Sequence, residues 1–184
     1  MAVFDASFLI LLLHPDAQAP IDPETGIAVE HARERIEHLV ASLEKKKEKI
    51  IIPSPAPAEF LVKADRAGAT YLGTMEGKRF LRISSFDKRA AVELATMTRE
   101  ALAQGDQRGG SDEPYQKVKF DRQIIAITKL EGENTLYSND VTLKTFAERA
   151  GIRLVTIANL DLPEESKQGV LDFPHPSSPN SKTQ

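Results

Sequence analysis

Short apolar runs alternate with longer segments of helical periodicity, and this alternation restricts the fold more than any other feature of the sequence. Five runs are typical of buried strands, at residues 2–5, 50–52, 80–83, 135–137 and 152–157. Segments with helical spacing of apolar residues separate them, at 6–13, 27–49, 69–76, 87–105, 121–130 and 141–150. A further helical segment begins at about residue 57. Strands that alternate with helices form parallel sheets covered by helices on both faces. We therefore predict an α/β fold with a central parallel five-stranded sheet between two helical layers.

The length of 184 residues is typical of one domain. We expect this domain to span residues 1–158. Residues 14–26 contain three prolines and a glycine, so we expect a loop insertion there. Residues 159–184 are polar and rich in proline and serine, and we expect this tail to be partly disordered, mainly beyond Pro174.

Charge and cysteine content exclude several classes of protein. A formal net charge of -3 does not suit a protein that holds nucleic acid by bulk charge, and the absence of cysteine excludes disulfides and thiolate metal sites. The apolar start is not expected to be a signal peptide, because it lacks Lys and Arg and contains Asp5. No segment is apolar enough to span a bilayer. We expect a cytoplasmic protein with no membrane association.

Four acidic residues are predicted to meet at one edge of the sheet. Asp5 ends the first strand and Asp140 follows the strand at 135–137, and parallel sheets place their sites at these carboxyl ends. Glu59 falls in the first turn of a helix that starts near residue 57, just beyond the second strand. Asp121 falls in the first turn of the most apolar helix, which follows a long polar loop over 104–115.

Each of these acids also has an ordinary explanation. Asp5, Asp121, Asp140 and also Asp87 are suited to helix N-caps or first turns, and Glu59 to a first turn favoured by the helix dipole. For Asp87 an ordinary cap is the preferred interpretation. For the other four, convergence at one edge favours a site.

Four acids without a basic partner would repel one another unless they bind a cation. Oxygen-only ligands suit Mg²⁺ or Mn²⁺. The histidines are not expected to be ligands, because they fall in a loop, on helix faces or in the tail: His14, His31, His38 and His175.

Several short motifs resemble a PIN domain over residues 2–157. They are Val3-Phe4-Asp5-Ala6-Ser7, Glu59 after a strand, Asp121-Arg122-Gln123-Ile124-Ile125-Ala126, Ser138-Asn139-Asp140 and the closing Gly151-Ile152-Arg153-Leu154-Val155. The resemblance implies a PIN-like fold and a Mg²⁺- or Mn²⁺-dependent ribonuclease. Many bacterial relatives are VapC-like toxins that a small antitoxin neutralises by entering the acidic site. The corresponding expectations are an RNA substrate, an antitoxin partner and a homodimer.

The resemblance also implies roles for individual residues. Asp5, Glu59, Asp121 and Asp140 would bind the metal and act in catalysis. A second group would support the site: Ser7, Ser138 and Asn139. Local positive charge near the third acid offers RNA contacts at Lys117, Lys119 and Arg122, although a solvated loop face explains these residues equally well.

The leading hypothesis is a metal-dependent endoribonuclease that forms the toxin of a toxin-antitoxin pair. The alternative is a PIN-like scaffold without catalysis, whose acidic pocket holds a basic peptide. An aspartate-nucleophile phosphatase is disfavoured, because Ser7 stands where a second Asp would be expected. Flavodoxin-like and receiver-like proteins do not explain Asp121.

Overall fold

The structure is a computed structural model that describes residues 1–64 and 68–167. Its strands form one sheet in which every pairing is parallel, in the order β3-β2-β1-β4-β5. The strands are β1 (Ala2–Phe4), β2 (Ile50–Pro53), β3 (Leu81–Ser84), β4 (Thr135–Tyr137) and β5 (Arg153–Val155). The predicted α/β fold with a parallel five-stranded sheet is therefore confirmed, and each strand lies within a residue or two of its expected place.

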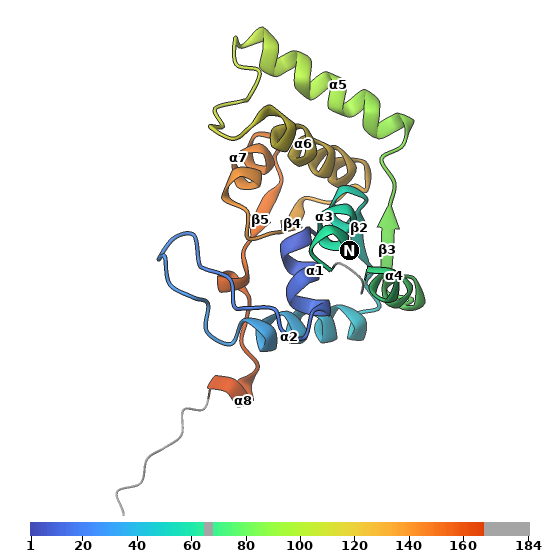
Figure 1. Cartoon of the computed structure of the whole chain (residues 1–184), viewed down its shortest axis with the longest axis vertical. Helices are drawn as coiled ribbons and strands as arrows, with labels where there is room; N and C mark the ends of the chain where they lie inside the picture. Colours follow the sequence, from blue (N-terminus) through green and yellow to red (C-terminus); the bar gives the residue numbers. More distant parts are fainter. Residues whose placement is uncertain (65–67, 168–184) are drawn as a thin grey trace, which may run out of the picture.

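Helices cover both faces of the sheet (Figure 1). They are α1 (Ala6–Leu13), α2 (Ala32–Lys45), α3 (Pro55–Ala64), α4 (Gly68–Gly77), α5 (Lys88–Ala103), α6 (Tyr115–Leu130), α7 (Val141–Arg149) and α8 (Glu164–Lys167), with a 3₁₀ turn η2 (Ile157–Asn159). Helices α1 to α4 pack on one face, and α6 and α7 pack on the other. Helix α5 lies outside α6, and of its residues only Ala90 is buried.

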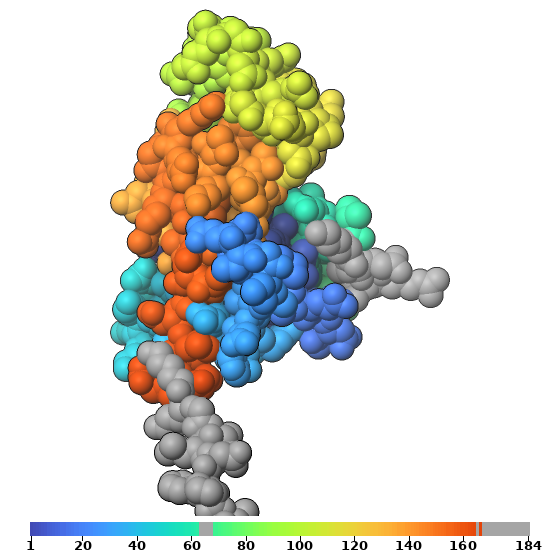
Figure 2. Space-filling model, turned by 90° about the vertical axis from the view of Figure 1, so that its left-hand side faces the viewer, coloured from blue at the N-terminus to red at the C-terminus, as the bar shows by residue number. Residues whose placement is uncertain are grey.

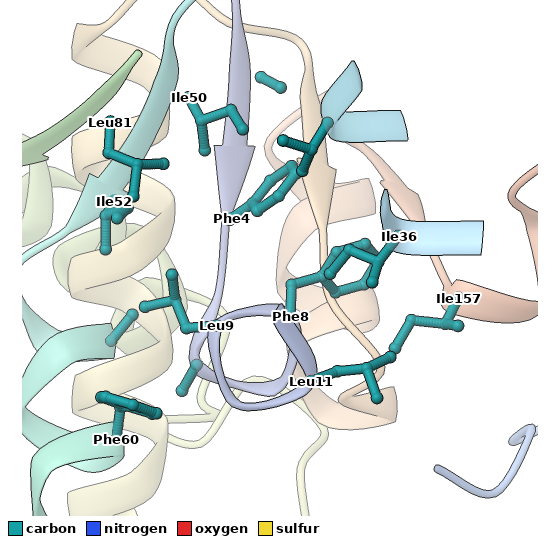
Figure 3. Packing of buried hydrophobic residues seen from close by; sticks show 14 of the residues in the cluster. Phe4, Phe8, Leu9, Leu11, Ile36, Ile50, Ile52, Phe60, Leu81 and Ile157 are labelled. Carbon is teal, nitrogen blue, oxygen red and sulfur yellow. The ribbon is translucent and has the colours of Figure 1, made fainter. Parts of the chain in front are cut away.

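The alternation of side chains along the strands builds a core on each face. In β1, Ala2 and Phe4 join the cluster beneath α1 and α2, whereas Val3 joins the cluster beneath α6 and α7. Figure 3 shows the first cluster, in which Phe4 and Phe8 lie beside side chains of β2 and α2. Because both faces are buried, the central strands consist almost entirely of apolar residues.

Strand β1 occupies the centre of the sheet, with β2 on one side and β4 on the other. The chain first adds β2 and β3 in one direction, and later adds β4 and β5 in the other. The carboxyl ends of β1 and β4 therefore flank the point where the strand order reverses. Open parallel sheets hold their ligand sites in the crevice at such a point.

Three helices begin at residues other than the predicted ones. Helix α2 begins at residue 32 instead of 27, because an antiparallel bridge between Ile21 and Ala28 and a left-handed turn at His31 precede it. Helix α3 begins at Pro55, since proline at a first helical position loses no hydrogen bond. Glu59 is thus in the second turn and not in the first.

Helix α6 differs most from the prediction. It begins at Tyr115, directly after Pro114, where the sequence had indicated the end of a polar loop. Asp121 therefore lies in the middle of the helix and not in its first turn. The largely polar segment 115–119 is helical because its one aliphatic residue, Val118, is fully buried against the sheet.

A loop follows α1 and runs from His14 to His31 over the protein surface, and it contains residues 14–26. Figure 2 shows this blue segment lying against the orange and red C-terminal part of the chain. The hydrogen bonds that hold it include those from Arg33 to the His14 carbonyl at 2.7 Å and from Asn139 to the Ile21 carbonyl at 2.8 Å.

The predicted tail is described only up to residue 167, where η2 and α8 follow the last strand. The disorder expected beyond Pro174 falls outside the described residues. Within residues 1–64 and 68–167, no helix has the length and apolar character needed to cross a membrane.

Candidate functional site

The four predicted acids line a single pocket of about 360 Å³. They come from four places in the fold: Asp5 after β1, Glu59 from α3, Asp121 from α6 and Asp140 at the start of α7. The carboxyl end of the sheet thus brings together residues that are far apart in the sequence.

Asp5 is a buried member of the polar network. Its side chain is 6% exposed, and Ser138 Oγ donates a hydrogen bond of 2.8 Å to its Oδ2. Burial raises the pKa of this carboxyl, and the negative charges of Glu59 and Asp140 add to the effect. Although Asp5 precedes α1, its side chain makes no capping hydrogen bond. Helix capping therefore does not explain an acid here.

Asp121 is buried in the interior of α6, where no capping role exists. Its Oδ2 atom is buried and has no hydrogen-bond partner within the described chain. Burial, together with the nearby carboxylates, raises the pKa of Asp121 to about 7 despite the opposing charge of Lys117. A buried carboxylate oxygen without a hydrogen bond is costly, and such a group is suited to binding a cation.

Asp140 has two roles at once. Its Oδ1 accepts hydrogen bonds from the backbone of Thr142 and Leu143 and so caps α7, while its Oδ2 faces the pocket and accepts from Lys117 at 2.5 Å. Burial alone would raise the pKa of Asp140, but the Lys117 ammonium and the two amides hold it below its usual value. Asp87, by contrast, accepts only from its own helix start and is the expected ordinary cap of α5.

Lys117 corrects the assumption that the acids have no basic partner. Its Nζ atom lies 2.5 Å from Asp140 Oδ2 and 3.7 Å from Asp121 Oδ2, so one ammonium group bridges two of the acids. The bond to Asp140 raises the pKa of Lys117 although its partial burial opposes this. Sequence spacing places Lys117 one helical turn before Asp121, but only the fold shows that it also reaches Asp140.

The three residues predicted to support the site form a chain of hydrogen bonds. Ser138 Oγ accepts from the Asp140 amide at 3.1 Å in addition to donating to Asp5. Ser7 Oγ accepts from the Asn139 amide at 3.0 Å. The Asn139 side chain then ties this turn to the insertion loop through Ile21. The turn after β4 thus fixes the positions of two of the acids.

Comparison with known proteins gives a match only at the level of structure. No family model matches the sequence, and no curated protein matches it. VapC20 of Mycobacterium tuberculosis, described as a toxin that cleaves the sarcin-ricin loop, matches with a TM-score of 0.50 and 14% identity over 83% of this chain and 97% of that one.

Two further matches come from toxin-antitoxin complexes solved with DNA. A chain of VapBC from Salmonella typhimurium matches with a TM-score of 0.53 and 18% identity, over 85% of this chain and 99% of that one. A chain of VapBC2 from Rickettsia felis, bound to a fragment of its promoter, matches with a TM-score of 0.50 and 15% identity, over 84% and 97%. The chain has a VapC-like PIN fold.

On this PIN fold, the three suggested RNA contacts occupy different environments. Lys117 lines the acidic pocket, and Lys119 is exposed with its ammonium 5.9 Å from the centre of the Tyr115 ring. Arg122 is only 3% exposed, stacks on Phe146 and donates to the Gln107 carbonyl at 2.9 Å. Arg122 is therefore buried and does not line the acidic pocket. Its helical spacing from Val118 and Ile125, both buried, is the sequence signal for this position.

The sequence did not identify the apolar rim of the pocket. Phe120 and Val62 line it and are 52% and 83% exposed. Large apolar side chains with this exposure beside buried carboxylates are suited to contact a ligand. The sequence offers only the position of Phe120 directly before Asp121 as a signal.

The donor set fits a hard divalent cation, since it contains only carboxylate oxygens and one of them is buried without a partner. Within residues 1–64 and 68–167, however, no three acidic, histidine or cysteine side chains stand close enough together to hold a metal ion. Lys117 bridges Asp121 and Asp140 instead. A cation at this site would therefore require Lys117 to move aside and the carboxylates to draw together.

Proposed function

We propose that this chain is a Mg²⁺- or Mn²⁺-dependent endoribonuclease and the toxin of a toxin-antitoxin pair. The observation that carries the proposal is the meeting of four carboxylates in one pocket at the reversal point of a PIN sheet, with an oxygen of Asp121 buried and without a hydrogen bond. The solved structures of similar fold, described as VapC and VapBC, support the choice of reaction.

In this proposal Asp5, Glu59, Asp121 and Asp140 hold the cation. When bound, such an ion lowers the pKa of water and stabilises negative charge on a phosphodiester. Ser138 keeps Asp5 oriented through its 2.8 Å hydrogen bond. Lys117, once released from Asp140, supplies a positive charge at the pocket for an RNA phosphate.

The exposed ring of Phe120 gives the pocket an apolar wall on which an RNA base can stack. This arrangement suits single-stranded RNA, because only an unstacked base offers its face to an aromatic side chain. The same wall and the acidic floor suit a segment of an antitoxin that combines apolar and basic side chains.

The test incubates the purified full chain with RNA, once in Mg²⁺ or Mn²⁺ and once in EDTA. The Asp121→Asn variant is incubated with RNA under the same conditions. Asp87→Asn is the matched control, because Asn is as good an N-cap as Asp and Asp87 lies outside the pocket. We expect cleavage by the wild type and by Asp87→Asn in metal only. Cleavage that persists in EDTA or in Asp121→Asn would refute the metal-dependent reaction.

A second function is favoured by Lys117, which already occupies the pocket with a cationic group. A scaffold that holds a basic peptide side chain would use the same acids without cleavage. This alternative predicts no RNA hydrolysis in any metal, together with saturable binding of a lysine- or arginine-containing peptide that Asp121→Asn weakens.

A further inference from the structure

A second pocket of about 360 Å³ lies on another side of α6, between that helix, α5 and α7. It shares no lining residue with the acidic pocket. Two arginines line it, Arg122 from α6 and Arg149 from the last turn of α7. The proposed ribonuclease reaction uses neither of them.

The two guanidinium groups are close neighbours at Gly109. A Cβ atom on this glycine would lie 2.9 Å from Arg149 Nη1 and 3.3 Å from Arg122 Nη2, so these two nitrogens are at most 6.2 Å apart, the sum of the two distances. The φ of Gly109 is +61°, which also requires glycine. Two positive charges at this separation repel each other, and burial together with Arg149 lowers the pKa of Arg122.

Neither arginine has an acidic partner. Among the described residues, no carboxylate oxygen lies within 4 Å of either guanidinium group; Arg149 donates to the Gly109 carbonyl at 2.6 Å and Arg122 to that of Gln107. Arg122 Nη1 is buried and meets no acceptor at all. Arg122 is buried, whereas Arg149 is exposed. Buried charges are normally paired, and the buried guanidinium of Arg122 has no directly bound counter-charge among the described residues.

The other charged groups described around the pocket bind neither arginine directly. Lys129 is already paired with Glu93, which does not line the pocket. Glu100 lines the pocket but is exposed and pairs with neither arginine. The negative charge of Asp106 raises the pKa of Arg122, but the two Asp106 oxygens accept from the backbone of Arg108 and Gly110 and bind neither guanidinium group directly.

We propose that the pocket between α5, α6 and α7 binds a phosphate group through Arg122 and Arg149. Guanidinium groups match the geometry of phosphate oxygens and bind them by paired hydrogen bonds. A doubly charged anion provides both arginines with a directly bound counter-charge. The phosphate belongs either to a small molecule or to an RNA strand that extends beyond the acidic pocket.

Calorimetric titration of the full chain with inorganic phosphate at constant ionic strength tests the site. We expect one saturable site that Arg149→Gln weakens by about tenfold, the usual effect of a lost charge-assisted hydrogen bond. Arg79→Gln is the matched control, because Arg79 is exposed, lies between α4 and β3 and lines no pocket described above. It removes the same charge and should change the affinity by less than about twofold.

Gln104→Glu keeps the test decisive if loss of Arg149 impairs folding. Gln104 lines the pocket at the end of α5, so the variant places a carboxylate beside the arginines without a change of size. We expect it to weaken phosphate binding by about tenfold and to raise the melting temperature. Absence of saturable binding by the wild type, or equal binding by Gln104→Glu, would overturn the proposal.

A second arm identifies the source of the phosphate. Two proteins are titrated with a short RNA: the Asp121→Asn variant, which leaves the substrate intact, and the double variant that also carries Arg149→Gln. A loss of RNA affinity upon Arg149→Gln supports the site and assigns the phosphate to RNA. Unchanged RNA affinity with weaker binding of inorganic phosphate supports the site and assigns it to a small ligand.

Discussion

Replacement of Asp121 by Asn should make the metal-free protein more stable at high pH. Asn has the size of a protonated Asp, so it keeps the shape of the pocket but cannot acquire the buried charge. In the wild type this carboxyl is 5% exposed, one of its oxygens has no hydrogen bond, and its pKa is about 7 against an ordinary value of 3.8. The fold therefore opposes ionisation of Asp121.

The size and sign of the effect follow from proton linkage. Below pH 4 Asp121 is protonated in both the folded and the unfolded chain, so it contributes no pH dependence. Between pH 4 and 7 the unfolded chain loses the proton and the folded chain keeps it, and the free energy of unfolding of the wild type falls by up to about 1.4 kcal/mol for each pH unit. The upper limit is about 4 kcal/mol, reached above pH 7. Because the site relaxes when the charge forms, we expect about 2 to 4 kcal/mol.

Urea unfolding of both proteins in EDTA, at pH 4, 6 and 8, measures this difference. The advantage of Asp121→Asn over the wild type should grow with pH, whereas Asp112→Asn, at an exposed position, should run parallel to the wild type. Mg²⁺ at about 100 times its dissociation constant should restore about 2.7 kcal/mol to the wild type at pH 8, and nothing to Asp121→Asn. Parallel curves for Asp121→Asn and wild type would show that Asp121 is not a strained buried acid.

Three further variants test other parts of the acidic pocket. Lys117→Gln removes the ammonium that bridges two of the acids, so calorimetry should show Mg²⁺ binding about tenfold more tightly; unchanged affinity would mean that Lys117 does not compete with the cation. Phe120→Ala should raise the KM for RNA roughly tenfold with little change in melting temperature, since the ring is exposed, and Phe120→Tyr should restore it; equal KM values would exclude stacking. Ser138→Ala breaks two buried hydrogen bonds, to Asp5 and from the Asp140 amide, and should cost roughly 2 to 3 kcal/mol in urea unfolding; a cost below about 0.5 kcal/mol would contradict the network.

The sheet was predictable because its signal is local. Runs such as Ile50-Ile51-Ile52 are β-branched, apolar and too short for a helix, so their place in the sequence indicates buried parallel strands. The acids at strand ends were predictable for the same reason, since a parallel sheet brings carboxyl ends to one edge. Asp5 and Asp140 lie in the pocket at the positions their strands imply.

Features that depend on tertiary packing were not predictable. Pro114 and the polar residues after it indicated a loop, and only burial of Val118 against the sheet makes them helical. The contact of Lys117 with Asp140 depends on how α6 crosses the end of β4. Arg122 carries a charge that sequence patterns assign to the surface, yet it stacks on Phe146 inside the protein.

The central position of β1 bears on the moment in synthesis at which the site can form. Its partner β4 is made more than a hundred residues later, and Asp5 has its hydrogen bond from Ser138 only when that strand is in place. Because contacts between distant parts of the chain form late, a nascent chain that ends before residue 140 holds only part of the acidic pocket. The complete site therefore forms only after nearly the whole domain has emerged from the ribosome.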